Sequence, residues 1–559
     1  MTDYELPRNT STRKRKRRRL LVIGVVAVLL AGGGVWWAVR ASQDSAAEDR
    51  AAAAEQATHC AGLAGRSGPG YYLSRQQDDG QCVGWTTELD YAFGSADAAT
   101  VSVVAKIVEE NRKVAAQPGK PYVRVAVLMP MTAKPDSKLA AGPILHSLEG
   151  AYTAQVYTNS GPTEYGDPVP QIQLVLANVG DDQKSWPDVV ARLGGLRDGE
   201  HPLVAVTGMG VSVAQTRDAA VELNSRWQLP SIGAVLTADD MTTRGAGTEP
   251  PGLFKVSPSN HDYAAALKNA LKDRQGLGPA YLVRDRNNDS YVQSLGNALV
   301  DEFAEDKLND HLSSFSGSTP PTTGSPGLFQ GAVDAIGIEN SGVVFYAGRD
   351  ADLPSLVRSL KNRRGQSASK NLVVATGVTG LVVVDSAKEG KLGEPLTTQD
   401  LKAARVTILA ASSTDPESWR AASNKPAHYD KFREVFTTGR AGFPEADLSD
   451  GYAIMHHDAV AAAAVAIHAA FGDKGGELPS SVDVRNRLAS FRDAPIQGAA
   501  GEFYWTEQQP PNDLWPVGRP VPVLTFPTPA PQAVVYSTTC QKLGNPLSLE
   551  DYKIVPCTS

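Results

Sequence analysis

The sequence predicts an α/β protein of two lobes that follows an N-terminal transmembrane helix. Three observations support this prediction: a cationic run that ends at an apolar segment, short β-branched runs that alternate with helix-length segments, and four cysteines in two local pairs. At roughly 100–200 residues per domain, a chain of 559 residues corresponds to several domains. The net charge of -7 disfavours nucleic acid as a partner.

The N-terminal segment has the pattern of a membrane anchor. Residues 13–19 are all Arg or Lys, and residues 20–39 follow without a charge. About twenty apolar residues span a bilayer, and the cationic flank stays in the cytoplasm. We therefore expect a single-pass protein of the cell membrane whose bulk is extracytoplasmic. Its expected segments are a basic cytoplasmic tail at 1–19, a transmembrane helix at 20–39 and a linker at 40–58. A cleaved signal peptide is the alternative.

The four cysteines are Cys60, Cys82, Cys540 and Cys557. An even number outside the membrane favours two short-loop disulfides in an oxidising compartment, Cys60 with Cys82 and Cys540 with Cys557, although four cysteines allow three pairings. Metal ligation is the weaker alternative because no C-x-x-C spacing occurs. We expect a membrane-proximal cap at 59–121 and a C-terminal tail at 536–559, each with one disulfide.

From residue 122 the pattern is typical of βα units around parallel sheets. The predicted strands are 123–128, 172–176, 203–207, 231–233, 280–283, 342–346, 372–376 and 406–410. The predicted helices are 149–158, 186–196, 213–227, 263–273, 291–304, 353–362 and 451–471. A helix at 99–115 precedes them, and 313–327 has the composition of a loop.

Several segments resemble the type I periplasmic binding proteins, in particular the leucine/isoleucine/valine-binding branch of ABC-importer proteins. The resemblance is carried by VRVAVLMPMT, LEGAYTAQ, LVAVTGMGVSVAQ, LPSIGAVLTADDMT, GLFKVSPSNHDYAAAL, AYLVRDRNNDSYVQSL, VVFYAGRDADLPSLVRSL, GYAIMHHDAVAAAAVAI and IQGAAGEFYW, in that order along the chain.

This resemblance, over about residues 122–527, implies a venus flytrap: two Rossmann-like lobes joined by three crossing segments, with a small ligand held in the cleft between them. We place lobe 1 at 122–250 and 412–500, and lobe 2 at 251–411 and 501–535. Closure of such lobes about a hinge is a recognised switching motion.

The turn at residues 208–212 is the strongest candidate for ligand contact in lobe 1. It follows a strand and opens a helix, so backbone N–H groups near Gly210 would attract an anionic group. By resemblance, Ser212 donates its hydroxyl to a ligand carboxylate, and Leu236 and Thr237 contribute from the next turn. Helix capping by Ser212 and Thr237 is the alternative role.

In lobe 2 the candidate ligand-binding residues are Tyr346, Arg349 and Val378. Arg349 stands where amino-acid-binding relatives carry an aromatic residue, and it would pair with a carboxylate or stack on a ring. Relatives that bind an amino acid often have an acidic group near Val378 for the ammonium. Its absence here puts an α-amino-acid ligand in doubt.

These features favour a binding protein over an enzyme. The dinucleotide pattern G-x-G-x-x-G fails at its third glycine, and G-x-S-x-G fails at its last. Asp458 and His468, the nominal partners of Ser212 in a hydrolase triad, point in different directions on one helix. No motif requires a cofactor or a metal, and His456 and His457 are expected to pack within a helix.

The predicted function is that of a membrane-anchored solute-binding protein that captures a small polar ligand, amino-acid-like or another carboxylate. The expected partner is an ABC-type permease. The alternative is a sensing ectodomain or a non-binding scaffold that acts through a membrane signalling protein.

Overall fold

The computed structural model describes most of the chain after residue 59. The described residues are 60, 67–68, 70–76, 78, 80–95, 97–134, 137–241, 252–272, 278–317, 327–391, 394–423, 425–491, 495–505, 515–527, 538–543 and 552–556. The predicted cytoplasmic tail, transmembrane helix and linker lie outside this part, and so does the predicted Cys540–Cys557 disulfide, because Cys557 is not among these residues.

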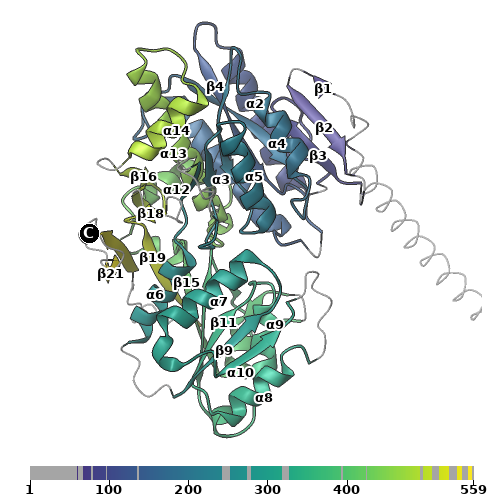
Figure 1. The fold of residues 1–559 in the computed structure, drawn as a ribbon, viewed down its shortest axis with the longest axis vertical. Coiled ribbons are helices and arrows are strands. Elements are labelled where there is room, and N and C mark those ends of the chain that lie inside the picture. The colour runs from purple at the N-terminus through teal and green to yellow at the C-terminus, as the bar shows by residue number, and fades with distance from the viewer. Residues whose placement is uncertain are drawn as a thin grey trace, which may run out of the picture.

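Lobe 1 is built on an eight-stranded sheet (Figure 1). The strand order is β1-β2-β3-β5-β4-β6-β7-β8, and the strands from β5 to β8 are parallel. The bounds are β1 Ser67–Gly68, β2 Tyr71–Arg75, β3 Cys82–Thr86, β4 Tyr122–Met129, β5 Gln171–Asn178, β6 Leu203–Gly208, β7 Ser231–Gly233 and β8 Leu253–Lys255. Counted from β4 along the chain, the parallel strands have the order 2-1-3-4-5 of a doubly wound sheet.

Lobe 2 repeats this topology. Its order is β10-β9-β11-β12-β15-β19-β20-β21, and the first five strands are parallel, again in the order 2-1-3-4-5. The bounds are β9 Ala280–Asp285, β10 Leu312–Phe315, β11 Val343–Ala347, β12 Leu372–Val378, β15 Val406–Ser412, β19 Pro520–Phe526, β20 Thr538–Leu543 and β21 Tyr552–Pro556. Both lobes are therefore Rossmann-like.

Helices cover both faces of each parallel sheet, which explains why the central strands of these sheets are rich in apolar residues. On lobe 1, α4 and α5 pack on one face and α2, α3, α13 and α14 on the other. On lobe 2, α6 and α7 pack on one face and α8, α9 and α10 on the other. The bounds are α2 Ala98–Ala115, α3 Ala141–Ser160, α4 Trp186–Gly194, α5 Ala214–Ser225, α6 Asn260–Leu271, α7 Ser290–Glu302, α8 Gln330–Ile338, α9 Leu353–Leu360, α10 Thr398–Ala404, α11 Pro416–Trp419, α12 Tyr429–Thr437, α13 Tyr452–Asp473 and α14 Ser481–Ser490.

Three segments cross between the lobes: residues 256–259, 413–415 and 518–519. All three lie later than the predicted boundaries after residues 250, 411 and 500, the second by the smallest margin. Strand β8 still pairs with β7 of lobe 1. Phe503 and Trp505, on β17 Gly501–Trp505, pack in the lobe 1 core, and β17 pairs with β16 Ile496–Gly498 and β18 Pro516–Val517.

The residues expected to form a separate cap continue the sheet of lobe 1. Strand β3 pairs antiparallel with β5, and β2 and β1 extend the sheet beyond it. Helix α2 packs on the same core as α3. The predicted disulfide between Cys60 and Cys82 is present and attaches the start of this region to β3.

All eight predicted strands are present, and the other strands, among them β8, β10 and β19, were not predicted. The assignment of residues 313–327 to a loop was wrong at its start, because Leu312–Phe315 forms edge strand β10 against β9. Helix α3 begins eight residues before the predicted start. The capping box of Ser259 and Asp262 begins α6 before the predicted residue 263.

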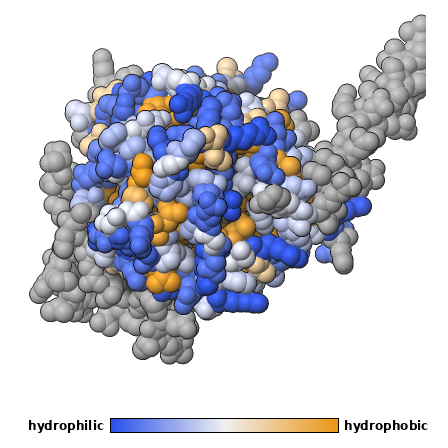
Figure 2. All heavy atoms as spheres, turned by 90° about the horizontal axis from the view of Figure 1, so that it is seen from above, coloured by the Kyte–Doolittle hydropathy of each residue, from blue (hydrophilic) through white to orange (hydrophobic). Residues whose placement is uncertain are grey.

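Helices α3 and α13 approach each other closely at Gly150. A Cβ at this position would overlap the carbonyl of Ala453 on α13, so only glycine fits. Among the described residues, α13 is the helix long and apolar enough to span a membrane, and it lies buried in lobe 1. Viewed from the lobe 1 end, the described surface is mostly hydrophilic with scattered apolar residues (Figure 2).

Candidate ligand-binding cleft

A cavity of about 780 Å³ lies between the two lobes. Lobe 1 lines it with residues 133–134, 137–138 and 140–141, and lobe 2 with residues 285, 287–289, 316–317 and 349–352. These segments follow β4, β9, β10 and β11. The cavity is therefore at the carboxyl ends of parallel strands, which is where open α/β sheets bind ligands.

Asp289 is the centre of an ion-pair network in this cavity. It caps α7 by accepting a hydrogen bond from the Tyr291 N–H, and its carboxylate pairs with Arg349 at 2.9 Å. Lys138 of lobe 1 reaches the same carboxylate at 3.2 Å, so one ion pair bridges the lobes. Burial alone would raise the pKa of Asp289, but the two cations outweigh it and lower the pKa.

Arg349 is held by several contacts at once. Its guanidinium lies 4.9 Å from the centre of the Tyr291 ring, and Nη2 donates to the Ser212 carbonyl of lobe 1 at 3.3 Å. The Tyr346 hydroxyl donates to the Arg349 carbonyl at 2.8 Å. Burial would lower the pKa of Arg349, yet Asp289 raises it, so the side chain is a fixed cation.

Two further carboxylates, those of Asp285 and Asp352, line the cavity. Asp285 accepts hydrogen bonds from the N–H groups of Asn287 and Gly317 at 3.0 and 2.9 Å. A Cβ on Gly317 would meet the carboxylates of both Asp285 and Asp352, so two acids converge at this backbone position. The cavity is thus lined by both cations and carboxylates.

The turn predicted to face a ligand has a left-handed backbone. Gly208, Met209 and Gly210 all have positive φ, at 85°, 64° and 65°. The Ser212 hydroxyl accepts hydrogen bonds from the N–H groups of Thr237 and Ala238 at 3.1 and 3.2 Å. Ser212 therefore fastens two loops of lobe 1 together, and helix α5 has no side-chain cap.

Of the seven predicted contact residues, Arg349 lines the cavity. Leu236 packs in an apolar core of lobe 1, and Tyr346 and Val378 pack in a core of lobe 2. Gly210, Ser212 and Thr237 are buried, and Ser212 meets Arg349 across the lobes. Contact of these residues with a ligand stays a prediction.

Sequence reasoning missed the polar and charged residues that line the cavity, chiefly Lys134, Lys138, Asp285, Asn287 and Asp289. A signal was present, because the first two follow the predicted strand 123–128 and the other three follow the predicted strand 280–283. Residues that directly follow parallel strands meet at one edge of the sheet.

The triad alternative has no geometric support in the described residues. The Asp458 carboxylate is held by Arg519 and by the N–H groups of Ala499 and Ala500. His468 contacts the Tyr165 carbonyl through Nδ1 at 2.7 Å. Neither side chain contacts Ser212.

Two doubly wound lobes of the same strand order, three crossings and a cleft at the strand ends define a type I periplasmic-binding-protein fold. Neither a protein-family model nor a curated protein matches the sequence.

Three similar solved structures are substrate-binding proteins. The leucine-binding protein LivK from Thermotoga maritima is 16% identical, with a TM-score of 0.48, over 72% of this chain and 94% of that one. An ABC-transporter substrate-binding protein from Desulfitobacterium hafniense in complex with Leu is 17% identical, with a TM-score of 0.48, over 72% and 97%. A solute-binding protein from R. palustris in complex with 4-hydroxybenzoate is 13% identical, with a TM-score of 0.46, over 74% and 99%.

Proposed function

We propose that this chain is an extracytoplasmic solute-binding protein that captures a small polar ligand between its lobes. The observation that carries the proposal is the cavity of about 780 Å³, which both lobes line with charged groups. Its volume is within the range of roughly 300–1,000 Å³ that small-molecule sites occupy.

The charges in the cavity support a ligand that carries a carboxylate, and an amino-acid-like zwitterion in particular. Lys134, Lys138 and Arg349 provide cations for the carboxylate. Asp285 and Asp352 provide acceptors for an ammonium, in place of the acidic group that is missing near Val378. A zwitterion would match the presence of both kinds of charge in the cavity.

We further propose that residues 20–39 anchor the protein in the cell membrane and that an ABC-type permease receives the ligand. The cationic run at 13–19 and the uncharged segment after it support this orientation. The disulfide of Cys60 and Cys82 favours an oxidising compartment outside the membrane.

The second candidate is a sensing ectodomain or a scaffold that acts through a membrane partner. It is favoured by the contacts that Arg349 and Lys138 already make with Asp289 and by the Arg349–Ser212 contact between the lobes. In this alternative the protein's own ion pairs take the place of a transported ligand.

A ligand panel on the purified full chain tests the proposal. The panel contains amino acids, the matching amines without the carboxylate, the matching acids without the ammonium, amides, short peptides and nucleosides. At a concentration a hundredfold above Kd, a ligand should stabilise the folded protein by about 2.7 kcal/mol. We expect an amino acid to raise the unfolding temperature more than its amine or acid.

Variants of cavity residues test whether the ligand that raises the unfolding temperature binds in the cavity. Lys138→Met and Asp285→Asn should each reduce the shift, while Lys184→Met, at an exposed ion pair with Asp182, should leave it unchanged. If no compound stabilises the wild-type chain, the scaffold alternative is favoured.

A further inference from the structure

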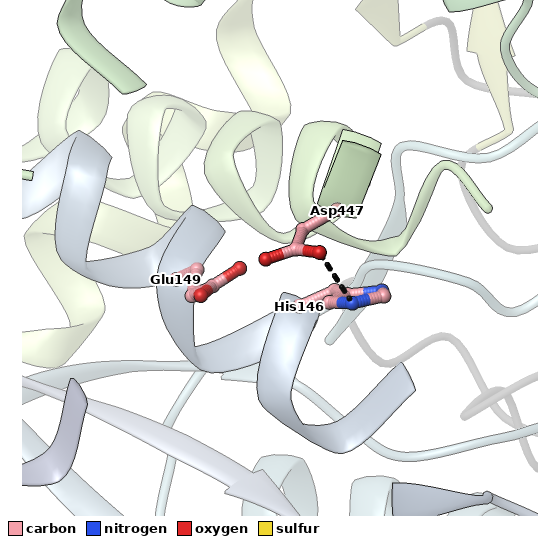
Figure 3. A group of neighbouring side chains, drawn as sticks. All are labelled: His146, Glu149 and Asp447. Carbon is pink, nitrogen blue, oxygen red and sulfur yellow. Dashed lines mark ion pairs between the residues drawn. The ribbon is translucent and has the colours of Figure 1, made fainter. Parts of the chain in front are cut away.

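A cluster of one histidine and two carboxylates lies in lobe 1, outside the cavity (Figure 3). His146 and Glu149 are three residues apart on α3, so they share one helix face. Asp447 comes from the short 3-10 helix η4 Glu445–Leu448. The three side chains each offer one ligand atom, and these atoms lie within 4.8 Å of one another.

Asp450 orients the histidine. Its carboxylate lies 2.7 Å from His146 Nδ1, which leaves Nε2 facing Asp447 Oδ1 at 3.5 Å. Metal-binding histidines almost always donate the other ring N–H to a carboxylate or carbonyl, which fixes the tautomer and the ring direction. The imidazole is therefore positioned as a ligand through Nε2.

The buried carboxyl group of Glu149 is not satisfied by hydrogen bonds from the described residues. Its side chain is 2% exposed, and its Oε2 atom is buried without a hydrogen-bond partner. In Figure 3 the carboxyl group points towards Asp447. The contacts with His146 explain the positions of Asp447 and Asp450, but they provide no hydrogen-bond partner for the Glu149 carboxyl group. Burying a carboxyl group without such a partner costs free energy.

We propose that His146, Glu149 and Asp447 bind a divalent first-row transition ion, with Zn²⁺ as the best match and water in the remaining position. Three protein ligands of the nitrogen and carboxylate type with an open fourth position are a common zinc arrangement. Bonds of about 2.0–2.1 Å in a tetrahedron separate ligand atoms by about 3.4 Å, and the Nε2–Oδ1 distance of 3.5 Å matches this value.

The position of the cluster also permits exchange of the ion with solvent. The side chains of His146 and Asp447 are 16% and 21% exposed, while Glu149 forms the buried side. An ion here would join α3, whose first residue Ala141 lines the cavity, to the segment that leads into α13. The proposal does not depend on the identity of the ligand in the cleft.

Calorimetric titration of the chelator-treated full chain with Zn²⁺ tests the proposal. We expect one ion per chain. Glu149→Gln should weaken binding by at least tenfold, and Asp450→Asn by roughly ten- to a hundredfold through loss of orientation. Glu339→Gln is the matched control, because Glu339 pairs with His311 at 2.6 Å outside this cluster and should not change the affinity.

Cobalt supplies a readout that does not depend on stability. Co²⁺ added to the chelator-treated wild type should give visible absorption bands of a low-symmetry four- or five-coordinate site, and Zn²⁺ should remove them. The proposal is overturned if the wild type binds no ion with one-to-one stoichiometry. It is also overturned if Glu149→Gln, shown to be folded by circular dichroism, binds Zn²⁺ as tightly as the wild type.

Discussion

Arg519 and Asp458 form a buried ion pair that connects the third crossing to helix α13. Nη2 of Arg519 lies 2.6 Å from Oδ2 of Asp458, and the two side chains are 1% and 0% exposed. Arg519 also donates from Nε to the Val256 carbonyl of the first crossing at 2.9 Å. The Arg519 side chain thus connects two of the three crossings to lobe 1. We expect these fixed segments to be the hinge for movement of lobe 2.

Removing the acid of this pair should destabilise the protein strongly. In Asp458→Asn the Arg519 charge stays buried without its counter-ion, and loss of one partner of a buried pair costs about 3–5 kcal/mol. Urea unfolding of the full chain, followed by tryptophan fluorescence, measures the change. Asp430→Asn is the control, because Asp430 is exposed in its pair with Lys425 and should cost about 0–1 kcal/mol. Equal losses of unfolding free energy in both variants would contradict a stabilising role of the buried Arg519–Asp458 pair.

His456 should make the stability depend on pH. Burial lowers the pKa of this side chain to about 3, whereas an unfolded histidine has a pKa of about 6.5. Because the folded pKa is the lower one, the unfolded chain binds the proton more tightly between these values. The contribution to stability is present above about pH 6.5 and is lost as the pH falls, by about 1.4 kcal/mol per unit.

Unfolding of wild type and His456→Gln between about pH 5 and pH 7 checks this expectation. The variant cannot titrate at this position, so its stability should fall less steeply towards low pH. The exposed His311 provides the control variant His311→Gln. A wild-type slope that survives in His456→Gln would assign the pH dependence to another group.

The Lys138–Asp289 ion pair should favour the closed arrangement of the lobes. The Lys138 side chain is 32% exposed, so its loss should shift the open and closed populations by a factor of about five at most, equivalent to about 1 kcal/mol. Energy transfer between dyes at residues 115 and 338, which are exposed on different lobes, reports the distribution. Lys138→Met should increase the low-transfer population, and Lys184→Met should not.

The Cys60–Cys82 disulfide should stabilise lobe 1 through the unfolded chain. The cysteines are 22 residues apart. A disulfide that closes a loop of this length lowers the entropy of the unfolded chain and so raises the free energy of unfolding by about 3 kcal/mol. The double variant Cys60→Ala/Cys82→Ala should lower the urea midpoint by a corresponding amount. An unchanged midpoint would show that β3 and its pairing with β5 hold this region without the bond.

The two-lobe fold could be predicted because most strands of its parallel sheets have a recognisable local sequence pattern. Strands such as β4 and β5 are buried on both faces, so their sequences are rich in Val, Ile and Leu. Strand β8 has only three residues, and the pairing of β3 with β5 joins residues far apart in the sequence. Such pairings leave no local pattern, which is why the cap was expected to be separate.

The candidate site was predictable only in part for the same reason. Arg349 could be identified through the family resemblance, but its partner Asp289 and the bridging Lys138 come from other segments. Ligand contact by Ser212 stays a prediction, and the sequence did not indicate that its hydroxyl accepts hydrogen bonds from two backbone N–H groups of a neighbouring loop. Which charges meet across a cleft depends on how the lobes are placed, and no sequence spacing encodes that.

The most direct test of a ligand site between the lobes is calorimetric titration of the tightest-binding panel compound into a chain whose cavity has been filled. Ala141 is exposed, begins α3 and lines the cavity, so Ala141→Trp adds bulk there without removing a polar group. Ala115→Trp, at the exposed end of α2, is the control. We predict one-to-one binding by the wild type and the control, and at least tenfold weaker binding by Ala141→Trp. Equal affinity in all three proteins, or no binding by the wild type, would contradict a ligand site in this cleft.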